Sequence, residues 1–324
     1  MLYNFISLPL NRPLSSPQRR PTLPSRRTLL LWIHHAVTAI TNLSCYQFTP
    51  LDRLEEWKGL LKSKCLELGV KGTILLAPEG INFFLSGTQT QLDPILSLIR
   101  TMPGLSGIRP KESPGSEQPF QRMLVKIKKE IVSFGVEGVD PALHPAPKIS
   151  PKELKQWLDE KRPLTLLDVR NGYEIRMGTF QGAVDPQIHN FRDFPKAVRK
   201  LDPSLKSQPV VMFCTGGIRC EKAGPFMEKE GFENIWQLDG GILKYFEEVG
   251  GAHYQGECFV FDERVGVDSK LRETDSVLCY NCQMPLLGSD LTHPHYVYEK
   301  SCPHCFHGKP KGRGNTTEQA GGTT

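Results

Sequence analysis

A reactive cysteine is predicted where an apolar strand ends. The segment Val210–Ala223 runs from four apolar residues into Cys214, a glycine pair, Arg219 and a helical pattern. Such a loop turns its backbone N–H groups toward the sulfur, and the N-terminus of the following helix adds positive potential. Both effects favour thiolate over thiol, so we expect Cys214 to be a catalytic nucleophile of low pKa rather than a buried structural cysteine. Arg219 is expected to help bind an anionic group there.

The length of this loop distinguishes two kinds of cysteine enzyme. Cysteine phosphatases place five residues between Cys and Arg, whereas this chain has four. The active-site loop consists of Thr215, Gly216, Gly217 and Ile218. The shorter loop resembles that of rhodaneses, which is sized for a persulfide sulfur. The flanking segments 166–174 and 238–242 also resemble rhodanese strands, although segment 178–183 lacks the Gly-His that common rhodaneses carry there.

Of the four cysteines outside the loop and the metal cluster, one has two possible roles and three are expected in the core. Cys220 could resolve an oxidised Cys214, or it could pack inward from the first helical turn, which we favour. Cys45, Cys65 and Cys258 fall on apolar faces and are predicted to lie in the core. Unpaired core cysteines beside a reactive thiolate suit a reducing cytoplasm rather than a disulfide framework.

A second cysteine cluster predicts a metal site near the C-terminus. Two Cys-x2-Cys pairs, separated by nineteen residues, match the spacing of paired zinc knuckles. The four expected ligands are Cys279, Cys282, Cys302 and Cys305. Four thiolates complete a tetrahedral shell, so the predicted Zn²⁺ is structural and has no open catalytic position. A redox pair or disulfides are the alternative interpretation.

The elements that position these residues form several blocks. A β-α-β-β-α-β pattern, typical of a ferredoxin-like α+β domain, is expected first. Its elements are Leu43–Phe48, Leu51–Leu68, Val70–Ala77, Ile81–Leu85, Thr88–Thr101 and Met123–Ile131. From residue 150 to 248 strands and helices alternate, as in an α/β domain with a parallel sheet.

These blocks give a complete division of the 324 residues. The predicted regions are a leader (1–40), a ferredoxin-like or acylphosphatase-like domain (41–135), a proline-rich linker (136–150), a rhodanese domain (151–250), a Cys-rich zinc-type region (251–307) and a disordered tail (308–324). No uncharged apolar run is long enough for a transmembrane helix, so no membrane partner is expected.

The basic charge of the chain resides in the leader. The net charge is +5, and residues 1–36 hold five arginines and no acidic residue. Three interpretations compete: an organellar transit peptide, a twin-arginine export signal, or translated upstream sequence with the true start near Val37. The remaining residues balance in charge, so the sequence gives no global sign of nucleic-acid binding.

Four separated motifs resemble the bacterial tRNA uridine hydroxylase family, in order, over about residues 40–305. They lie at Lys71–Asn82, Arg122–Val132, Cys214–Ala223 and Gly256–Val265. The resemblance implies oxygen-dependent conversion of the wobble uridine to 5-hydroxyuridine, with tRNA as partner and Cys214 essential. A persulfide or another thiol-derived intermediate is one option. Hydroxylation itself does not follow from residue spacing.

Two other functional classes remain open. The first is rhodanese-type sulfur transfer through a Cys214 persulfide, and the second is a non-catalytic zinc-bearing RNA-binding module. No flavin, haem or nicotinamide motif is found, and the Gly216-Gly217 pair does not form a dinucleotide fingerprint.

RNA contact would have to come from a local basic patch. The predicted residues are Arg122, Lys126, Lys128 and Lys129. On a strand, Lys126 and Lys128 share one face about 6.6 Å apart, a spacing comparable to that of neighbouring phosphates. A solvated face is the alternative interpretation from the residues alone. The family resemblance favours RNA binding.

Overall fold

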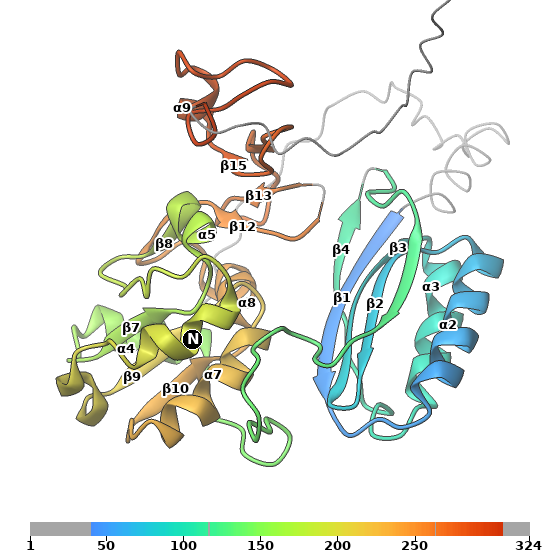
Figure 1. Cartoon of the computed structure of the whole chain (residues 1–324), viewed down its shortest axis with the longest axis horizontal. Coiled ribbons are helices and arrows are strands. Elements are labelled where there is room, and N and C mark those ends of the chain that lie inside the picture. The colour runs from blue at the N-terminus through green and yellow to red at the C-terminus, as the bar shows by residue number, and fades with distance from the viewer. Residues whose placement is uncertain (1–39, 116, 263, 307–324) are drawn as a thin grey trace, which may run out of the picture. The chain divides into compact units, whose positions relative to one another are not determined.

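The computed structural model describes residues 40–115, 117–262 and 264–306 (Figure 1). The predicted tail and all but the last residue of the predicted leader lie outside these residues. No helix in the described ranges combines the length and apolar character needed to cross a membrane.

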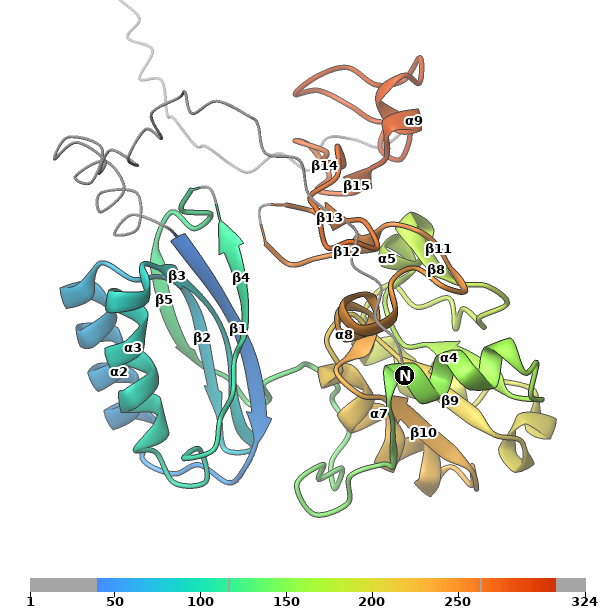
Figure 2. The same cartoon turned by 180° about the vertical axis from the view of Figure 1, so that it is seen from behind.

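The N-terminal part is a five-stranded sheet with two helices on one face (Figures 1 and 2). Its elements are β1 (Ile40–Phe48), α2 (Leu54–Leu68), β2 (Lys71–Ala77), β3 (Gly80–Gly87), α3 (Gln89–Arg100), β4 (Lys111–Gly115) and β5 (Met123–Ile127). The strand order is β4-β1-β3-β2-β5. Strands β1 to β4 therefore have the antiparallel order expected of the predicted β-α-β-β-α-β pattern, and β5 adds a parallel edge beside β2.

Two details of the predicted strands are wrong. The predicted pattern assigns no element to Lys111–Gly115, which contains Pro114, but this segment forms β4 at the edge of the sheet, where proline is tolerated. The strand that begins at Met123 ends at Ile127 instead of Ile131 and occupies the opposite edge. Only one further ladder bond, from Lys128 N–H to the Leu76 carbonyl, continues beyond it.

Amphipathic helices, with apolar residues three or four positions apart, close the core of this sheet. Trp57, Leu61 and Cys65 of α2 are buried against strand residues such as Ile74 and Phe83. Alternation along β1 leaves Ser44, Tyr46 and Phe48 on the face without helices, because Leu43 points into the core.

The central part has a parallel sheet in the order β6-β10-β9-β7. Its elements are β6 (Lys148–Ile149), α4 (Pro151–Asp159), β7 (Thr165–Asp168), α5 (Gly172–Met177), β8 (Gly178–Phe180), α6 (Phe194–Val198), β9 (Val210–Phe213), α7 (Ile218–Lys229), β10 (Ile235–Leu238) and α8 (Gly241–Val249). Two short 3-10 helices, Phe191–Asp193 and Pro203–Ser207, complete it.

Both faces of this parallel sheet are covered, which explains why Val210–Phe213 is apolar at every position. Val210 and Met212 pack into one cluster with α6 and α7. Val211 and Phe213 pack into the opposite cluster with α4 and α8. The predicted parallel α/β domain is confirmed.

The predicted linker is more ordered than expected. Residues 148–149 form strand β6, which pairs with β10 at the edge of the parallel sheet. Phe134, just before the linker, is buried among Phe191, Phe194 and Phe226. These residues therefore belong to the second core rather than to a free connection.

The C-terminal part consists of short hairpins. Its elements are β11 (Tyr254–Gly256), β12 (Cys258–Phe259), β13 (Gly266–Val267), β14 (Val277–Leu278), β15 (Pro285–Leu286) and α9 (Gly288–Leu291). Strand β11 pairs with β8, so this part begins as an extension of the central domain. The turn from β14 to β15 carries the first Cys-x2-Cys pair.

Candidate active site

Cys214 follows β9 directly, and the next four residues form the predicted loop into α7. The sulfur is fully buried and accepts a hydrogen bond from the Gly217 N–H at 3.1 Å. Gly217 has a φ of 101°, a left-handed conformation that favours glycine, and it precedes the first residue of α7. The backbone therefore curls around the sulfur at a helix N-terminus, as the sequence predicted.

The glycine pair Gly240-Gly241, at the start of α8, holds the Cys214 loop in place. The Ile242 N–H donates to the Cys214 carbonyl at 2.9 Å, and the Leu243 N–H donates to the Thr215 carbonyl at 3.1 Å. A Cβ on Gly241 would lie only 2.4 Å from the Cys214 carbonyl oxygen. The N-terminus of α8 thus fixes the loop by close backbone contact.

The surroundings of Cys214 favour its thiolate. Burial by itself would raise the pKa of Cys214, but it is outweighed by a hydrogen bond from the Cys220 thiol. The charge of Arg219 and the backbone N–H groups of Arg219 and Cys220 act in the same direction. Together they lower the pKa of Cys214 from 9.0 to about 5. At neutral pH the sulfur is therefore ionised.

Cys220 lies in the core and donates to the Cys214 sulfur. It is fully buried in the cluster that contains Val210 and Met212. Burial, together with the neighbouring Cys214 thiolate, raises its pKa well above the ordinary value, so it remains a neutral thiol. The inward packing that we favoured is what the structure contains. The resolving role stays a prediction.

Arg219 is held by a carboxylate that sequence reasoning did not assign. Its Nη1 and Nη2 donate to the two oxygens of Glu174 at 2.6 and 2.7 Å, and Glu174 is fully buried. Burial disfavours the charged carboxylate, but the Arg219 charge outweighs it, and the pKa of Glu174 falls. The predicted anion-binding guanidinium therefore already has an internal anion. Arg219 acts on Cys214 through the electrostatic field of its positive charge.

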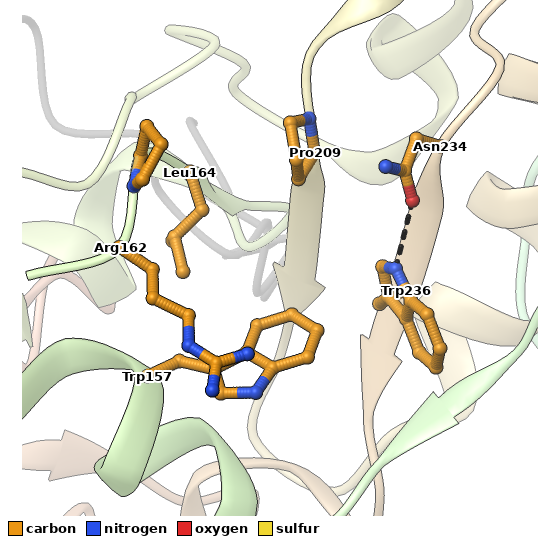
Figure 3. Close-up of a pocket in the computed structure, with 7 residues that line it drawn as sticks. Trp157, Arg162, Leu164, Pro209, Asn234 and Trp236 are labelled. Carbon is orange, nitrogen blue, oxygen red and sulfur yellow. Dashed lines mark hydrogen bonds between the residues drawn. The ribbon is translucent and has the colours of Figure 1, made fainter. Parts of the chain in front are cut away.

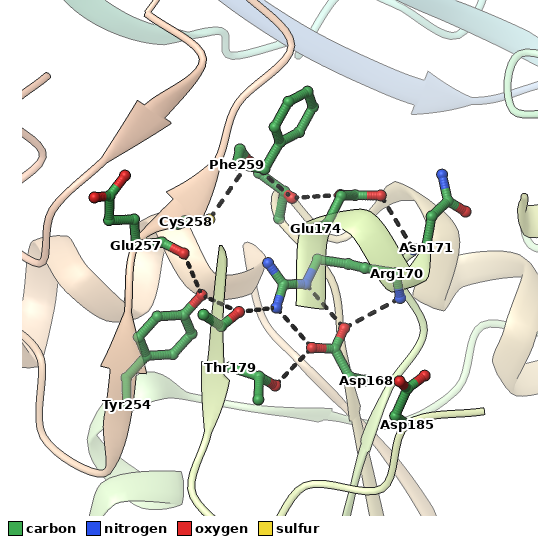
Figure 4. A network of polar contacts seen from close by, with 12 residues as sticks. Asp168, Arg170, Asn171, Glu174, Thr179, Asp185, Tyr254, Glu257, Cys258 and Phe259 are labelled. Carbon is green, nitrogen blue, oxygen red and sulfur yellow. Dashed lines mark hydrogen bonds and ion pairs between the residues drawn. The ribbon is translucent and has the colours of Figure 1, made fainter. Parts of the chain in front are cut away.

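A buried polar network places Glu174 (Figure 4). Asp168 and Arg170, at the end of β7, form a fully buried pair with Nε–Oδ1 and Nη2–Oδ2 distances of 2.9 and 2.6 Å. Thr179, in the segment that lacks the rhodanese Gly-His, donates to Asp168 at 2.7 Å. Asn171 directly precedes α5, and its N–H donates to Glu174 at 3.1 Å.

The open face of the N-terminal sheet contributes two side chains near the loop. The Tyr46 hydroxyl donates to Glu221 at 3.3 Å. A Cβ on Gly217 would lie only 2.7 Å from the Tyr46 hydroxyl oxygen. Burial, followed by the charges of Glu221 and Cys214, raises the pKa of Tyr46. Lys111 of β4 donates to the Gly240 carbonyl at 2.7 Å. No motif in the sequence indicated either contact.

Three residues from separate motifs meet in one ion-pair cluster. The Lys222 ammonium, which is 2% exposed, lies 2.7 Å from both Glu79 Oε2 and Glu130 Oε1. Glu79 also accepts from the Ile131 N–H, and the Asn82 amide donates to the Ile131 carbonyl. These contacts tie the β2–β3 turn and the end of the N-terminal domain to the first turns of α7.

The predicted RNA-binding residues are all exposed to solvent. They are Arg122, Lys126, Lys128 and Lys129. Val125 is buried against the helices, so Lys126 projects from the opposite face of β5. This alternation agrees with the period-two prediction, and the RNA-binding role itself stays a prediction.

The four predicted metal ligands come together. Cys279, Cys282, Cys302 and Cys305 have sulfur atoms within 4.8 Å of one another. Three of the sulfur pairs are 3.6, 3.7 and 3.9 Å apart. Tetrahedral Zn–S bonds of about 2.3 Å would separate sulfurs by about 3.8 Å, so this cluster fits a metal ion. Arg176 joins the region to α5 through Asp290 at 2.8 Å.

A pocket of about 250 Å³ lies elsewhere and is lined in part by Trp157 and Trp236 (Figure 3). Leu164, Pro209 and Asn234 also line it, and these residues immediately precede strands β7, β9 and β10. Ligands of open α/β sheets bind at the carboxyl ends of the strands, where Cys214 is found. The pocket is therefore at the wrong end of the sheet for the cysteine chemistry.

Comparison with known proteins agrees with this organisation. Residues 40–131 match the family described as a UPF0176 acylphosphatase like domain, and residues 150–248 match the rhodanese-like domain. A tRNA uridine(34) hydroxylase from Cupriavidus taiwanensis is 45% identical over 277 residues, which cover 84% of this chain and 98% of that protein. The chain belongs to the family of the tRNA uridine(34) hydroxylases. The resemblance inferred from the four motifs is thereby confirmed.

A second member of the family and one solved structure are also similar to parts of this chain. The tRNA uridine(34) hydroxylase of Burkholderia cenocepacia is 46% identical over 275 residues, covering 82% of this chain and 97% of that protein. The rhodanese-like domain of an Anabaena protein is 26% identical, with a TM-score of 0.29, over 34% of this chain and 79% of that one. The family relation rests on the hydroxylases.

Sequence reasoning missed Glu174, Tyr46 and the partners of Lys222. Glu174 enters the sequence analysis only at the end of a segment that resembles a rhodanese strand, yet a buried Arg two residues past a glycine pair requires a counter-charge. Glu79 lies in the first of the four motifs, and the sequence assigns it no role. The sequence signal for this contact is charge. Two of the four motifs each carry an acidic residue, Glu79 and Glu130, and a third carries Lys222.

Proposed function

We propose that this protein hydroxylates the wobble uridine of tRNA at C5, with molecular oxygen as co-substrate and Cys214 as the reactive sulfur. The observation that carries the proposal is the ionised, enclosed sulfur at the end of β9 in a chain of this family. Relatives that span nearly the same length carry the name tRNA uridine(34) hydroxylase.

The residues around Cys214 have distinct roles in this proposal. The Gly217 N–H and the Cys220 thiol stabilise the negative charge on the sulfur. Arg219 adds positive potential, and Glu174 holds its guanidinium in one orientation. A thiolate is the nucleophilic form of cysteine, so the loop prepares the sulfur for covalent chemistry before any substrate arrives.

Nucleoside mass spectrometry tests the function. A strain that lacks the gene is complemented with wild type, Cys214→Ala or Cys258→Ala. Cys258 is a matched control because it is also fully buried beside the site, while burial raises its pKa to about 12 and leaves it a neutral thiol. We expect 5-hydroxyuridine derivatives with wild type and Cys258→Ala only. Equal amounts with Cys214→Ala would refute the role of this sulfur.

Sulfur transfer is the second candidate, because the loop has the rhodanese length between Cys214 and Arg219. The same experiment separates the two functions. Loss of a thiolated nucleoside in the Cys214→Ala strain, with hydroxylated nucleosides unchanged, would favour sulfur transfer. Unchanged nucleosides in every strain, including the deletion, would refute both.

We propose that the C-terminal cysteine cluster holds one structural Zn²⁺. All four ligands are sulfur, the preferred donor type for structural zinc, and together they leave no open coordination position. Metal analysis should give about one zinc per chain in wild type. The double variant Cys279→Ser with Cys302→Ser should lose it, whereas Cys65→Ser, in the N-terminal core, should retain it. Zinc bound equally by the double variant would refute the site.

We propose that the basic patch of Arg122, Lys126, Lys128 and Lys129 contacts tRNA phosphates. Each phosphate contact adds about 0.7 to 0.9 to the slope of log affinity against log salt. The double variant Lys126→Gln with Lys128→Gln should therefore reduce that slope by about 1 to 2. The control is Lys62→Gln with Lys64→Gln on helix α2, which covers the other face of the sheet. Equal slopes in both variants would exclude the patch.

We further propose that the protein works in the cytoplasm, with residues 41–135 and 151–250 as its two folded domains and 251–307 as its Cys-rich region. None of the nine cysteines forms a disulfide in the structure, which supports a reducing compartment. Fractionation of cells that produce the full chain tests the location, and recovery of the protein outside the cytoplasm would refute it.

A further inference from the structure

Phe261 is an exposed aromatic residue beside a buried catalytic loop. Its side chain is 49% exposed, in the turn that follows β12. The Arg219 guanidinium carbon lies 5.7 Å from the centre of the Phe261 ring. Arg219 is the residue whose charge favours the Cys214 thiolate, so this ring stands at the margin of the reactive loop.

Neighbouring rings fix the orientation of Phe261. Phe259 meets it edge to face, with ring centres 5.0 Å apart and planes at 89°. Phe259 in turn meets Tyr173 at 5.3 Å and 83°. These aromatic contacts are specific in geometry, so the row of three rings presents the outer one in a defined position.

The row is connected to the loop by a polar contact as well. The Thr215 hydroxyl lies 3.4 Å from the Phe259 carbonyl oxygen, and Thr215 directly follows Cys214. A single exposed hydrophobic residue usually needs no explanation. Phe261 differs because it combines exposure with contacts to Arg219 and, through Phe259, to the loop.

A half-exposed ring of this kind is a platform for one planar group. Proteins that recognise unpaired RNA bases stack them on aromatic side chains, often beside an arginine. We propose that Phe261 stacks the base at the wobble position of the tRNA anticodon and so holds it at the Cys214 loop. This inference rests on the proposed function, because it takes the target base of that reaction as its ligand.

Affinity measurements with two RNA hairpins test the stacking. One anticodon stem-loop carries uridine at the wobble position, and the other carries an abasic sugar there. Binding to the full-length protein is measured without oxygen, which prevents turnover. Stacking of one base is worth about 5- to 150-fold in affinity. We therefore expect wild type to prefer the uridine hairpin by that factor.

The variants follow from the geometry. Phe261→Ala should bind both hairpins equally, and so should Phe261→Leu, which retains apolar volume but loses the planar face. Phe261→Trp should restore the preference. Tyr298→Ala is the control, because Tyr298 is a 73% exposed aromatic residue of the Cys-rich region and the proposal gives it no role. It should keep the wild-type preference.

One result would overturn the inference: a Phe261→Ala protein that keeps the preference for the uridine hairpin. This includes a protein that loses the same factor of affinity for both hairpins, because a structural effect does not depend on the base. Failure of the proposed function is distinguishable, since it would show as absence of 5-hydroxyuridine with wild type, whatever the hairpins report.

Discussion

The thiol of Cys220 should set much of the acidity of Cys214. The variant Cys220→Ala removes a donor to the Cys214 sulfur and supplies none in its place. A hydrogen bond to a charged group is worth about 1.5 to 3 kcal/mol, and 1.36 kcal/mol corresponds to one pKa unit. The midpoint of the thiolate titration should therefore rise by about 1 to 2 pH units above its wild-type value of about 5.

Thiolate absorbance in the ultraviolet measures this midpoint without requiring access of a reagent to the buried sulfur. Each titration is referred to a matched protein that carries Cys214→Ser, so that other thiols cancel. Cys258→Ala is the control, because its thiol bonds to the Phe259 carbonyl and not to Cys214. A Cys220→Ala protein that titrates like wild type would refute the proposed donation.

The variant Cys220→Ser separates the two roles of this residue. Serine can still donate to the thiolate, so the midpoint should stay near that of wild type, whereas a resolving disulfide is no longer possible. If Cys220 is only a donor, activity survives in Cys220→Ser. In wild type and in Cys220→Ser, activity should be level at neutral pH. It should fall as the pH drops through the midpoint of the Cys214 titration, because protonation removes the nucleophile.

Further predictions concern the charged pairs around the site. Lys222→Met leaves two carboxylates without their partner and should lower the free energy of unfolding by about 2 to 4 kcal/mol in denaturant titrations. The control Lys64→Met breaks only the exposed Lys64–Glu67 pair and should lower it by less than about 1 kcal/mol. Equal losses would contradict the assignment of a structural cluster. Arg176→Ala should speed hydrogen exchange in residues 285–291 without releasing metal, and unchanged exchange would show that the Asp290 contact does not restrain them. Glu174→Gln should move the Cys214 titration to lower pH, because the Arg219 charge is then uncompensated, and a shift to higher pH would reverse this reasoning.

The chemistry was predictable from sequence where neighbours along the chain create it. The Cys214 loop depends on a strand, two glycines and a helix start, all contiguous in the chain. The Cys279–Cys282 and Cys302–Cys305 pairs are likewise local, and the distance between the pairs leaves the connecting segment free to close. The amphipathic stripe of α2 and the apolar run of β9 follow from period and burial in the same way.

Contacts between distant segments were not predictable in this manner. Strand β4 was missed because its Ser, Pro and Gly residues disfavour strands, and only pairing with β1 makes it one. Tyr46 alternates correctly on β1, but nothing in its surroundings along the chain reveals Glu221 as its partner. Arg219 was expected to face a ligand because the sequence does not reveal how close the Glu174 carboxylate comes.

The Lys222 cluster has a consequence for exchanging the two domains. Its ammonium is paired with carboxylates from two segments of the other domain, so a change at one of the three positions leaves a charge without its partner. Without the lysine, Glu79 and Glu130 would face each other unbalanced. A chimaera that exchanges one of the domains should therefore lose stability unless this triad is carried across intact.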